Sequence, residues 1–309
     1  MPRKKPQPKP ASRQQTASAP PTVSGRWLLT AAAISFVGAA LCAWGALCLL
    51  FWQGSWQLLY HPTAQIARTP ASLSLPFDSI GFATNDAGQP QLSGWWIPAA
   101  NAKFTVVYLH GQDGNLGDTV DALQSLHLTG VNLLAFDYRG YGQSQFVHPS
   151  EARWREDAES ALAYLTGTRH LDPKSLILFG SGLGADLALE VAAEHPEIAG
   201  IVLDQPLEAP ANAIFNDARA RMVPAHLLVR DRFDLEGAAA KLRIPSLWFA
   251  VPLTSGNGVH GRSPTPFEKA GPTKMLVWLA KPASNERDRN QALSRWLSDV
   301  QSHAQISHN

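Results

Sequence analysis

The stretch Leu176-Ile-Leu-Phe-Gly-Ser-Gly-Leu-Gly-Ala-Asp-Leu-Ala188 combines three local signals that decide the fold. Its first four residues are apolar, which is typical of a strand buried on both faces of a sheet. Glycines at positions 180, 182 and 184 then allow a tight turn. A helical sequence follows the last of these glycines. We therefore predict a strand, a sharp turn centred on Gly182, and a helix that begins directly after it.

Similar apolar runs recur along the chain and alternate with helical patterns. The runs begin at Phe104, Val131, Leu176, Ile198, Pro245 and Lys274, and the helical patterns cover 118–128, 150–165, 184–194 and 285–301. An alternating pair of runs, 79–84 and 91–97, predicts an antiparallel hairpin before them. This order predicts the fold class α/β, with a doubly wound and mostly parallel sheet. Residues 205–243 interrupt the alternation with two short helical stretches, and we expect a small cap insertion there.

The N-terminal segments differ from the rest of the chain in composition. Residues 1–26 hold six basic residues, six prolines and no carboxylate, so we expect a disordered basic tail. The segment from Trp27 to Trp52 has no charge, and as a helix it would extend about 39 Å, more than the roughly 30 Å hydrocarbon layer. We predict an uncleaved transmembrane anchor over 27–52, with a cleaved secretory signal as the alternative. A cytoplasmic basic tail would place the main domain, 57–302, on the periplasmic or extracytoplasmic side.

The composition of the main domain excludes some classes of partner and cofactor. Without the six basic residues of the tail, 20 basic residues remain against 25 acidic ones, so nucleic acid is not an expected partner. Both cysteines, Cys42 and Cys48, lie in the apolar segment, so no disulfide is expected in the domain. No spacing of histidines, cysteines and carboxylates indicates a metal site, and we expect no cofactor. The membrane is the expected partner of residues 27–52.

An ordered set of motifs surrounds the turn at Gly182. In chain order these are Tyr60-His-Pro, His110-Gly-Gln-Asp-Gly-Asn, Phe136-Asp-Tyr-Arg-Gly-Tyr-Gly-Gln-Ser, Pro149-Ser-Glu, His195-Pro-Glu and Arg230-Asp-Arg-Phe-Asp. Together they resemble the α/β-hydrolase superfamily, and within it the membrane-anchored, small-cap group of serine esterases, thioesterases and peptidase-like proteins. The resemblance covers about residues 57–300. It implies a Ser–Asp–His triad and an oxyanion hole.

The positions that the resemblance assigns to the triad carry other residues. The family turn reads G-x-S-x-G, and here Gly182 stands at the serine position. Thr254 stands about where the family has its carboxylate, and Ser284 about where it has its histidine. The resemblance also assigns the oxyanion hole to the backbone amides of Gln112 and Leu183. These substitutions predict a hydrolase fold whose catalytic groups are missing.

Ser181 does not replace the missing serine, because a register shift by one residue would put Phe179 and Leu183 where the turn needs small residues. We expect Ser181 to be a turn residue with a local hydrogen bond. His260, in a glycine-rich loop near the expected site, and Asp204, at a strand end, are alternative functional groups. The candidates for a binding pocket are His110, Gly111, Ser181, Asp204 and His260.

Three functional hypotheses follow. The first is a catalytically impaired pseudoenzyme of hydrolase fold that binds a small acyl ligand or a protein partner. The second is an active hydrolase of esters, thioesters or amides that uses non-standard residues. The third and most remote is an NAD-binding oxidoreductase, because Gly180, Gly182 and Ala185, followed by Asp204 after the next strand, also fit a dinucleotide-binding pattern.

Overall fold

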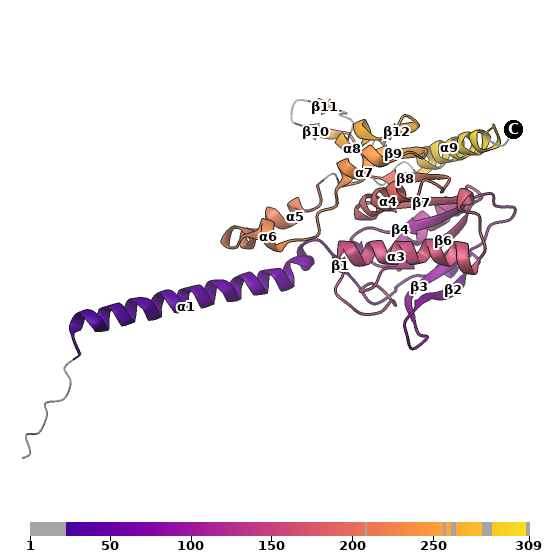
Figure 1. Ribbon diagram of the computed structural model, residues 1–309. Helices are drawn as coiled ribbons and strands as arrows, with labels where there is room; N and C mark the ends of the chain where they lie inside the picture. The colour runs from indigo at the N-terminus through magenta and orange to yellow at the C-terminus, as the bar shows by residue number, and fades with distance from the viewer. Residues whose placement is uncertain (1–22, 208, 256–257, 261–263, 280–285, 307–309) are drawn as a thin grey trace, which may run out of the picture. The chain divides into compact units, whose positions relative to one another are not determined.

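The computed structural model describes residues 23–207, 209–255, 258–260, 264–279 and 286–306 (Figure 1). The chain divides into two compact units, 1–47 and 48–309. Helix α1 (Gly25–Gly54) begins in the first unit and ends in the second. Together with the short helix η1 (Ser55–Leu58), it forms a stretch that is long and apolar enough to cross a membrane. Phe51, near the end of α1, is buried in the core of the second unit.

The centre of the second unit is a sheet of eight strands in the order β12-β9-β8-β7-β4-β6-β3-β2. The strands are β2 (Asp78–Thr84), β3 (Pro90–Ile97), β4 (Thr105–Leu109), β6 (Asn132–Asp137), β7 (Leu176–Ser181), β8 (Gly200–Asp204), β9 (Ser246–Ala250) and β12 (Lys274–Trp278). The pairs β2–β3 and β3–β6 are antiparallel, and all other neighbours are parallel. The predicted α/β class with a mostly parallel sheet is confirmed.

Helices cover both faces of this sheet, as the nearly continuous apolar strands require. On one face, α3 (Glu151–Ala163), α4 (Leu183–Glu194) and α7 (Leu235–Lys241) contribute to a core that contains Trp154 and Trp248. On the other face, α2 (Val120–His127) and α9 (Glu286–Ile306) contribute to a second core that contains Tyr108 and Trp296. The parallel strands end at one edge of the sheet, where the sequence places its motifs.

The segment between β8 and β9 contains four short helices: α5 (Asn212–Phe215), η6 (Ala218–Met222), α6 (Ala225–Leu228) and α7. The sequence predicted the first three as two helical stretches, and α7 was missed. Two small sheets pair β1 (His61–Pro62) with β5 (Asp113–Gly114) and β10 (Leu253–Ser255) with β11 (Gly258–His260). The β10–β11 hairpin and α8 (Thr265–Lys269) were also missed. The missed elements α7, α8, β10 and β11 have only three to seven residues each, too few for a clear hydrophobic period.

Candidate functional site

The turn between β7 and α4 has the sharp geometry that its glycines predict. Gly182 lies at φ 55° and ψ −124°, a region that residues with a side chain rarely adopt. Its N–H donates to the Asp204 carbonyl at 2.9 Å. A Cβ atom on Gly180 would lie 2.2 Å from the Gly184 carbonyl oxygen, and one on Gly184 would lie 2.2 Å from that of Leu109. Backbone contacts therefore exclude side chains on both sides of Gly182.

The position of Gly182 itself has room for a side chain. A Cβ atom there would meet the Gln112 side-chain oxygen at 3.3 Å and nothing closer. That oxygen instead accepts a long hydrogen bond, 3.4 Å, from the Leu183 N–H. The Gln112 carbonyl oxygen is held by the Tyr141 hydroxyl at 2.8 Å and by the His61 N–H at 2.9 Å. The Leu183 backbone amide, one of the two amides predicted to stabilise an oxyanion, therefore already has an acceptor within the protein, the side-chain oxygen of Gln112.

His110, a predicted pocket residue, is enclosed by other side chains and is not among the residues that line the cavity beside the turn. Its side chain is only 1% exposed and packs against the rings of Tyr138 and Trp154. Nδ1 donates to the Gly111 carbonyl at 2.8 Å, and burial lowers the pKa of His110 to about 4. The imidazole is therefore neutral and enclosed at neutral pH. Gly111 does border the turn, because a Cβ there would lie 3.3 Å from the Ser181 carbonyl oxygen.

The nearest carboxylate to His110 belongs to Asp137 at the end of β6. His110 Nε2 lies 3.7 Å from Asp137 Oδ1, too far for a hydrogen bond, and it has no hydrogen-bond partner among the described residues. Asp137 Oδ1 accepts from the Leu116 N–H at 2.8 Å. Burial raises the pKa of Asp137 to about 7. These groups connect the loops at the ends of β4 and β6, and both side chains are only 1% exposed.

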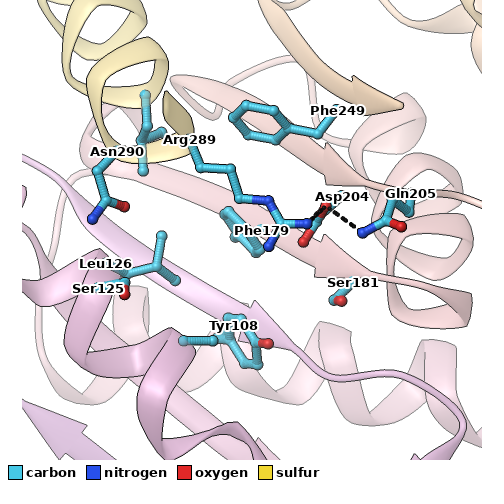
Figure 2. Close-up of a pocket in the computed structure, with 12 residues that line it drawn as sticks. Tyr108, Ser125, Leu126, Phe179, Ser181, Asp204, Gln205, Phe249, Arg289 and Asn290 are labelled. Carbon is cyan, nitrogen blue, oxygen red and sulfur yellow. Dashed lines mark hydrogen bonds and ion pairs between the residues drawn. The ribbon is translucent and has the colours of Figure 1, made fainter. Parts of the chain in front are cut away.

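A cavity of about 210 Å³ opens beside the turn, on the face covered by α2 and α9 (Figure 2). Its polar wall consists of Tyr108, Ser125, Ser181, Asp204, Gln205, Arg289 and Asn290, and its apolar wall of Ala122, Leu126, Phe179, Phe249 and Leu293. Asp204 and Ser181, two of the predicted pocket residues, lie in this wall at the ends of β8 and β7. The cavity therefore occupies the carboxyl edge of the sheet, where open α/β sheets bind ligands.

An ion pair forms the charged part of this cavity. Arg289 Nη2 donates to Asp204 Oδ1 at 3.0 Å, and Gln205 Nε2 donates to the same oxygen at 3.2 Å (Figure 2). Burial raises the pKa of Asp204, and the nearby Arg289 charge opposes that shift. The Arg289 Nε is buried and has no hydrogen-bond partner within the described part of the chain. The pair brings one cationic and one acidic group to the cavity wall.

The Tyr108 hydroxyl and the Asp204 carboxylate share the cavity wall with Ser181, and Asp204 already accepts hydrogen bonds from Arg289 and Gln205. Burial raises the pKa of the Tyr108 hydroxyl, and a hydrogen bond with Ser181 opposes the shift in part. A phenol with a raised pKa stays protonated and cannot accept the serine proton at neutral pH. No histidine is among the described residues that line the cavity. The local environment of Ser181 therefore fits the predicted hydrogen-bonded turn residue and not an activated nucleophile.

The other predicted positions are only partly described. Thr254 lies in β10, where its backbone pairs with Val259, and His260 lies in β11, paired with Leu253. The structure gives no side-chain description for Thr254 or His260. Ser284 lies outside the described residues. Within the described residues, no group of three or more histidine, cysteine or carboxylate side chains could hold a metal ion.

The sequence analysis missed Arg289, Tyr108 and Gln205. Arg289 stands 85 residues after Asp204 in the chain, so no local pattern links them. One signal was available in the sequence. A helix that follows the last strand begins at the carboxyl edge of the sheet, so its first turns lie near the site. A charged residue there is a reasonable site candidate. The dinucleotide hypothesis also weakens here, since the Asp204 carboxylate already binds Arg289 and Gln205.

Known proteins resemble this chain in sequence. A family model described as serine aminopeptidase, S33, matches residues 100–242. An uncharacterised protein of Mycobacterium tuberculosis is 28% identical over 213 residues, which cover 68% of this chain and 73% of that protein. The uncharacterised protein YfhR of Salmonella typhi is 30% identical over 57% of this chain and 63% of its own length. An uncharacterised membrane protein of Saccharomyces cerevisiae is 29% identical over 48% of this chain and 53% of its own length.

Solved structures show the same fold. An esterase of Pyrococcus furiosus superposes with a TM-score of 0.58 and 18% identity, over 78% of this chain and 98% of that one. The α/β hydrolase GrgF from Penicillium superposes with a TM-score of 0.57 and 18% identity, over 74% of this chain and 99% of that one. The sheet order, the turn geometry at Gly182 and these matches agree. The chain therefore has the α/β-hydrolase fold, and the turn between its β7 and α4 carries glycine at position 182.

Proposed function

We propose that this chain is a membrane-anchored pseudo-hydrolase that binds a small ligand in the cavity beside Gly182 and does not catalyse serine-type hydrolysis. The observation that carries the proposal is the geometry of Gly182. It adopts φ 55° and ψ −124° at the start of α4, the nucleophile position of the superfamily, and it has no side chain with which to attack. The backbone of a hydrolase is present without its nucleophile.

The surroundings of Gly182 support the same conclusion. Ser181 has Tyr108 as its neighbour and no imidazole among the described residues of the cavity, and the Asp204 carboxylate there already accepts hydrogen bonds from Arg289 and Gln205. The Leu183 amide, which would stabilise a tetrahedral intermediate, is directed at the Gln112 side-chain oxygen. Hydrolysis of an ester or amide requires both an activated nucleophile and open oxyanion donors. The described residues that line the cavity include no histidine to activate a serine, and the Leu183 amide already has an acceptor.

The cavity favours a ligand with one polar end and one apolar end. Asp204 and Arg289 contribute charged groups to its lining, and Phe179, Phe249 and Leu293 contribute apolar ones. A volume of about 210 Å³ suits a small molecule or the end of a short acyl chain. The guanidinium of Arg289, which lines the cavity, suits a carboxylate or carbonyl oxygen. A short-chain carboxylic acid is therefore the class of ligand to test first.

The N-terminal segment supports the proposed location. Helix α1 is long and apolar enough to cross a bilayer, and basic residues precede it. Positive charge beside a membrane helix is retained on the cytoplasmic side in most membrane proteins. The main domain is therefore proposed to lie on the periplasmic or extracytoplasmic side. A reporter that is active only in the cytoplasm can be fused to the C-terminus to test this orientation. Activity of that reporter would contradict it.

A fluorophosphonate probe tests the absence of catalysis, because it labels only an activated serine. We expect no labelling of the full-length protein in detergent. Gly182→Ser should also remain unlabelled and inactive on ester substrates, because no base is in place. Both Gly182→Ser and the matched control Gly182→Ala should lower the free energy of unfolding by about 1–3 kcal/mol, because φ 55° is unfavourable for either residue. Labelling of the wild type at Ser181, or esterase turnover by Gly182→Ser, would refute the proposal.

Ligand binding is tested separately by thermal unfolding with short-chain carboxylic acids. A ligand that binds only the folded state raises the unfolding temperature as its concentration rises above its dissociation constant. We expect a rise for the wild type and a smaller one for Arg289→Met. If neither carboxylic acids nor their esters shift the wild-type transition, the ligand part of the proposal fails, while the absence of catalysis stands or falls on the labelling result.

A further inference from the structure

A second and larger cavity lies where α1 ends against the main domain. Its volume is about 740 Å³, and all of its lining residues belong to the unit 48–309. Three segments form it, and they contribute Trp52 and Trp56 from the end of α1 and η1, Ser150 and Arg153 from the start of α3, and Leu228 and Arg230 from the cap segment. We call this cavity the anchor groove. Nothing in the proposed function uses it.

The anchor groove continues into an apolar surface beside α1. An adjoining cavity is lined by Cys48, Leu49 and Trp52 of the last turns of α1, and by Leu227, Leu228 and Arg230 of the cap segment. Leu227 is 84% exposed. This leucine lies next to the final apolar turns of the helix, at the boundary between the hydrocarbon layer and water. The cap segment thus extends the apolar surface of the helix end.

Tryptophan side chains mark the level of this groove. Trp52 and Trp56 both line it, and the Trp56 ring stacks on His148 with centroids 4.8 Å apart. Amphipathic indole rings settle at the boundary between headgroups and hydrocarbon. Phe51 fixes the same turn of α1 to the domain core. The groove is therefore held at the end of the apolar helix by packed side chains and not by a flexible linker.

Two arginines in the anchor groove lack a carboxylate partner within the described ranges. Arg230 is exposed and forms no hydrogen bond or ion pair with the residues that the structure describes. The Arg153 guanidinium donates to the His148 carbonyl at 2.9 Å and has no described carboxylate within ion-pair distance. The groove's own carboxylates are otherwise engaged. Glu156 binds Arg139 at 2.6 Å, and burial raises the pKa of Asp231 while the more distant charge of Arg153 opposes that shift.

We propose that the anchor groove binds the headgroup of an anionic phospholipid from the membrane that α1 crosses. The phosphate would lie between Arg153 and Arg230, and the acyl chains would run along Trp52, Leu227 and Leu228. Guanidinium groups bind phosphate through charge-assisted and often bidentate hydrogen bonds. The apolar surface that continues from the groove onto α1 favours a lipid over a free phosphate ion. The bound lipid would hold the cap segment at the membrane surface.

The test uses the full-length protein in lipid nanodiscs. Discs of phosphatidylcholine are compared with discs that also contain phosphatidylglycerol. Native mass spectrometry then measures how much phosphatidylglycerol stays bound to the protein after the protein is released from the disc. We expect the wild type to retain it and the double variant Arg153→Gln/Arg230→Gln to retain at least about tenfold less, because each charged hydrogen bond lost weakens binding by roughly that factor. Arg295→Gln, on the exposed surface of α9, is the matched control and should retain lipid like the wild type.

Two further measurements separate a bound lipid from a bound phosphate ion. Leu227→Gln should also reduce retention, since it removes an acyl contact and leaves both charges in place. Equal retention by the double variant and the wild type would overturn the proposal. So would a thermal stabilisation by inorganic phosphate in phosphatidylcholine discs that equals the effect of phosphatidylglycerol. If the double variant melts below the wild type in pure phosphatidylcholine, Arg230→Gln alone decides, because its side chain has no described partner to lose.

Discussion

Two clusters of polar side chains lie at the carboxyl edge of the sheet, and they differ in what their polar atoms contact. His110, Asn115 and Asp137 form the loop network; each is at most 2% exposed, and its bonds go mainly to loop backbone. Ser181, Asp204, Gln205 and Arg289 form the cavity cluster, which borders open space. The loop network carries the family's most recognisable sequence motifs, yet it fixes the loops. The cavity cluster has the freedom to bind a ligand.

The difference shows that a position at the strand ends is not enough to define a functional residue. His110 follows β4 directly, but its ring is enclosed by aromatic side chains. Arg289 belongs to no motif, but its side chain reaches the cavity (Figure 2). The direction of the side chain decides which cluster a residue joins. Substitutions in the loop network should therefore affect folding, and those in the cavity cluster should mainly affect binding.

The largest expected effect distinguishes Asn115, in the loop network, from Asn290, on the wall of the cavity. Asn115 donates to Thr63 Oγ1 at 2.7 Å and to the Gln65 carbonyl at 2.9 Å, and accepts from the Gly117 N–H at 2.8 Å. Asn115→Ala leaves several buried groups unpaired and should lower the free energy of unfolding by about 4 kcal/mol. Asn290→Ala, on the cavity wall, should change it by less than about 0.5 kcal/mol. Thermal and denaturant unfolding measure both. Equal effects would remove the distinction between the clusters.

The second prediction concerns pH. Asp137 has a folded pKa of about 7, raised by burial from 3.8, so its contribution to stability is present at low pH and is lost as the pH rises through about 7. The stability of Asp137→Asn relative to the wild type should therefore improve by about 2 kcal/mol between pH 5 and pH 8. The opposite contribution of His110, whose pKa is lowered to about 4, is present in both proteins and largely cancels. A difference independent of pH would show that Asp137 titrates normally.

The third prediction tests the ion pair of the cavity cluster. Arg289→Met leaves Asp204 without its cation and should cost about 1.5 kcal/mol at pH 8, a value reduced for partial exposure of the arginine. The pKa of Asp204 is already raised, so at pH 5 more of the carboxyl is protonated and the cost should be smaller. Unfolding at the two pH values measures this. The double variant Arg289→Met/Asp204→Asn should lose the pH dependence, and its persistence would exclude Asp204 as the cause.

The smallest expected effect is at the turn that lies between the clusters. Gln112→Leu removes the acceptor of the Leu183 N–H, a long bond of 3.4 Å, and should cost about 0.5 kcal/mol. Hydrogen exchange measured by mass spectrometry should become faster in the peptide that contains Leu183. Gln124→Leu is a control away from the turn and should leave that exchange unchanged. Unchanged exchange in Gln112→Leu would mean that the oxygen of Gln112 does not protect the amide.

Much of the fold was predictable because its signals are local. The runs at Phe104, Leu176 and Pro245 have the length and character of buried strands, and each became a parallel strand of the sheet. Gly182 was predictable in the same way, since a strand, three alternating glycines and a helix lie within thirteen residues. Backbone contacts at Gly180 and Gly184 explain why no other residue type fits beside it.

The cavity cluster was only half predictable. Ser181 and Asp204 stand at strand ends and could be selected from the sequence, but the Arg289 contact joins distant parts of the chain. The contact of the Gln112 side chain was also not predicted. The resemblance assigned its backbone amide, whereas the structure directs its side-chain oxygen to Leu183. Which atom of a residue faces a site depends on rotamers and packing, and these have no signature in a single sequence.

The backbone at Gly182 also makes a change of residue easier in one direction than in the other. Glycine relaxes at φ 55°, whereas serine must be held there by the surrounding structure. A change from serine to glycine at this backbone conformation therefore releases strain, whereas the change from glycine to serine adds it. The two directions of substitution at position 182 thus differ in their effect on stability, whatever their effect on chemistry.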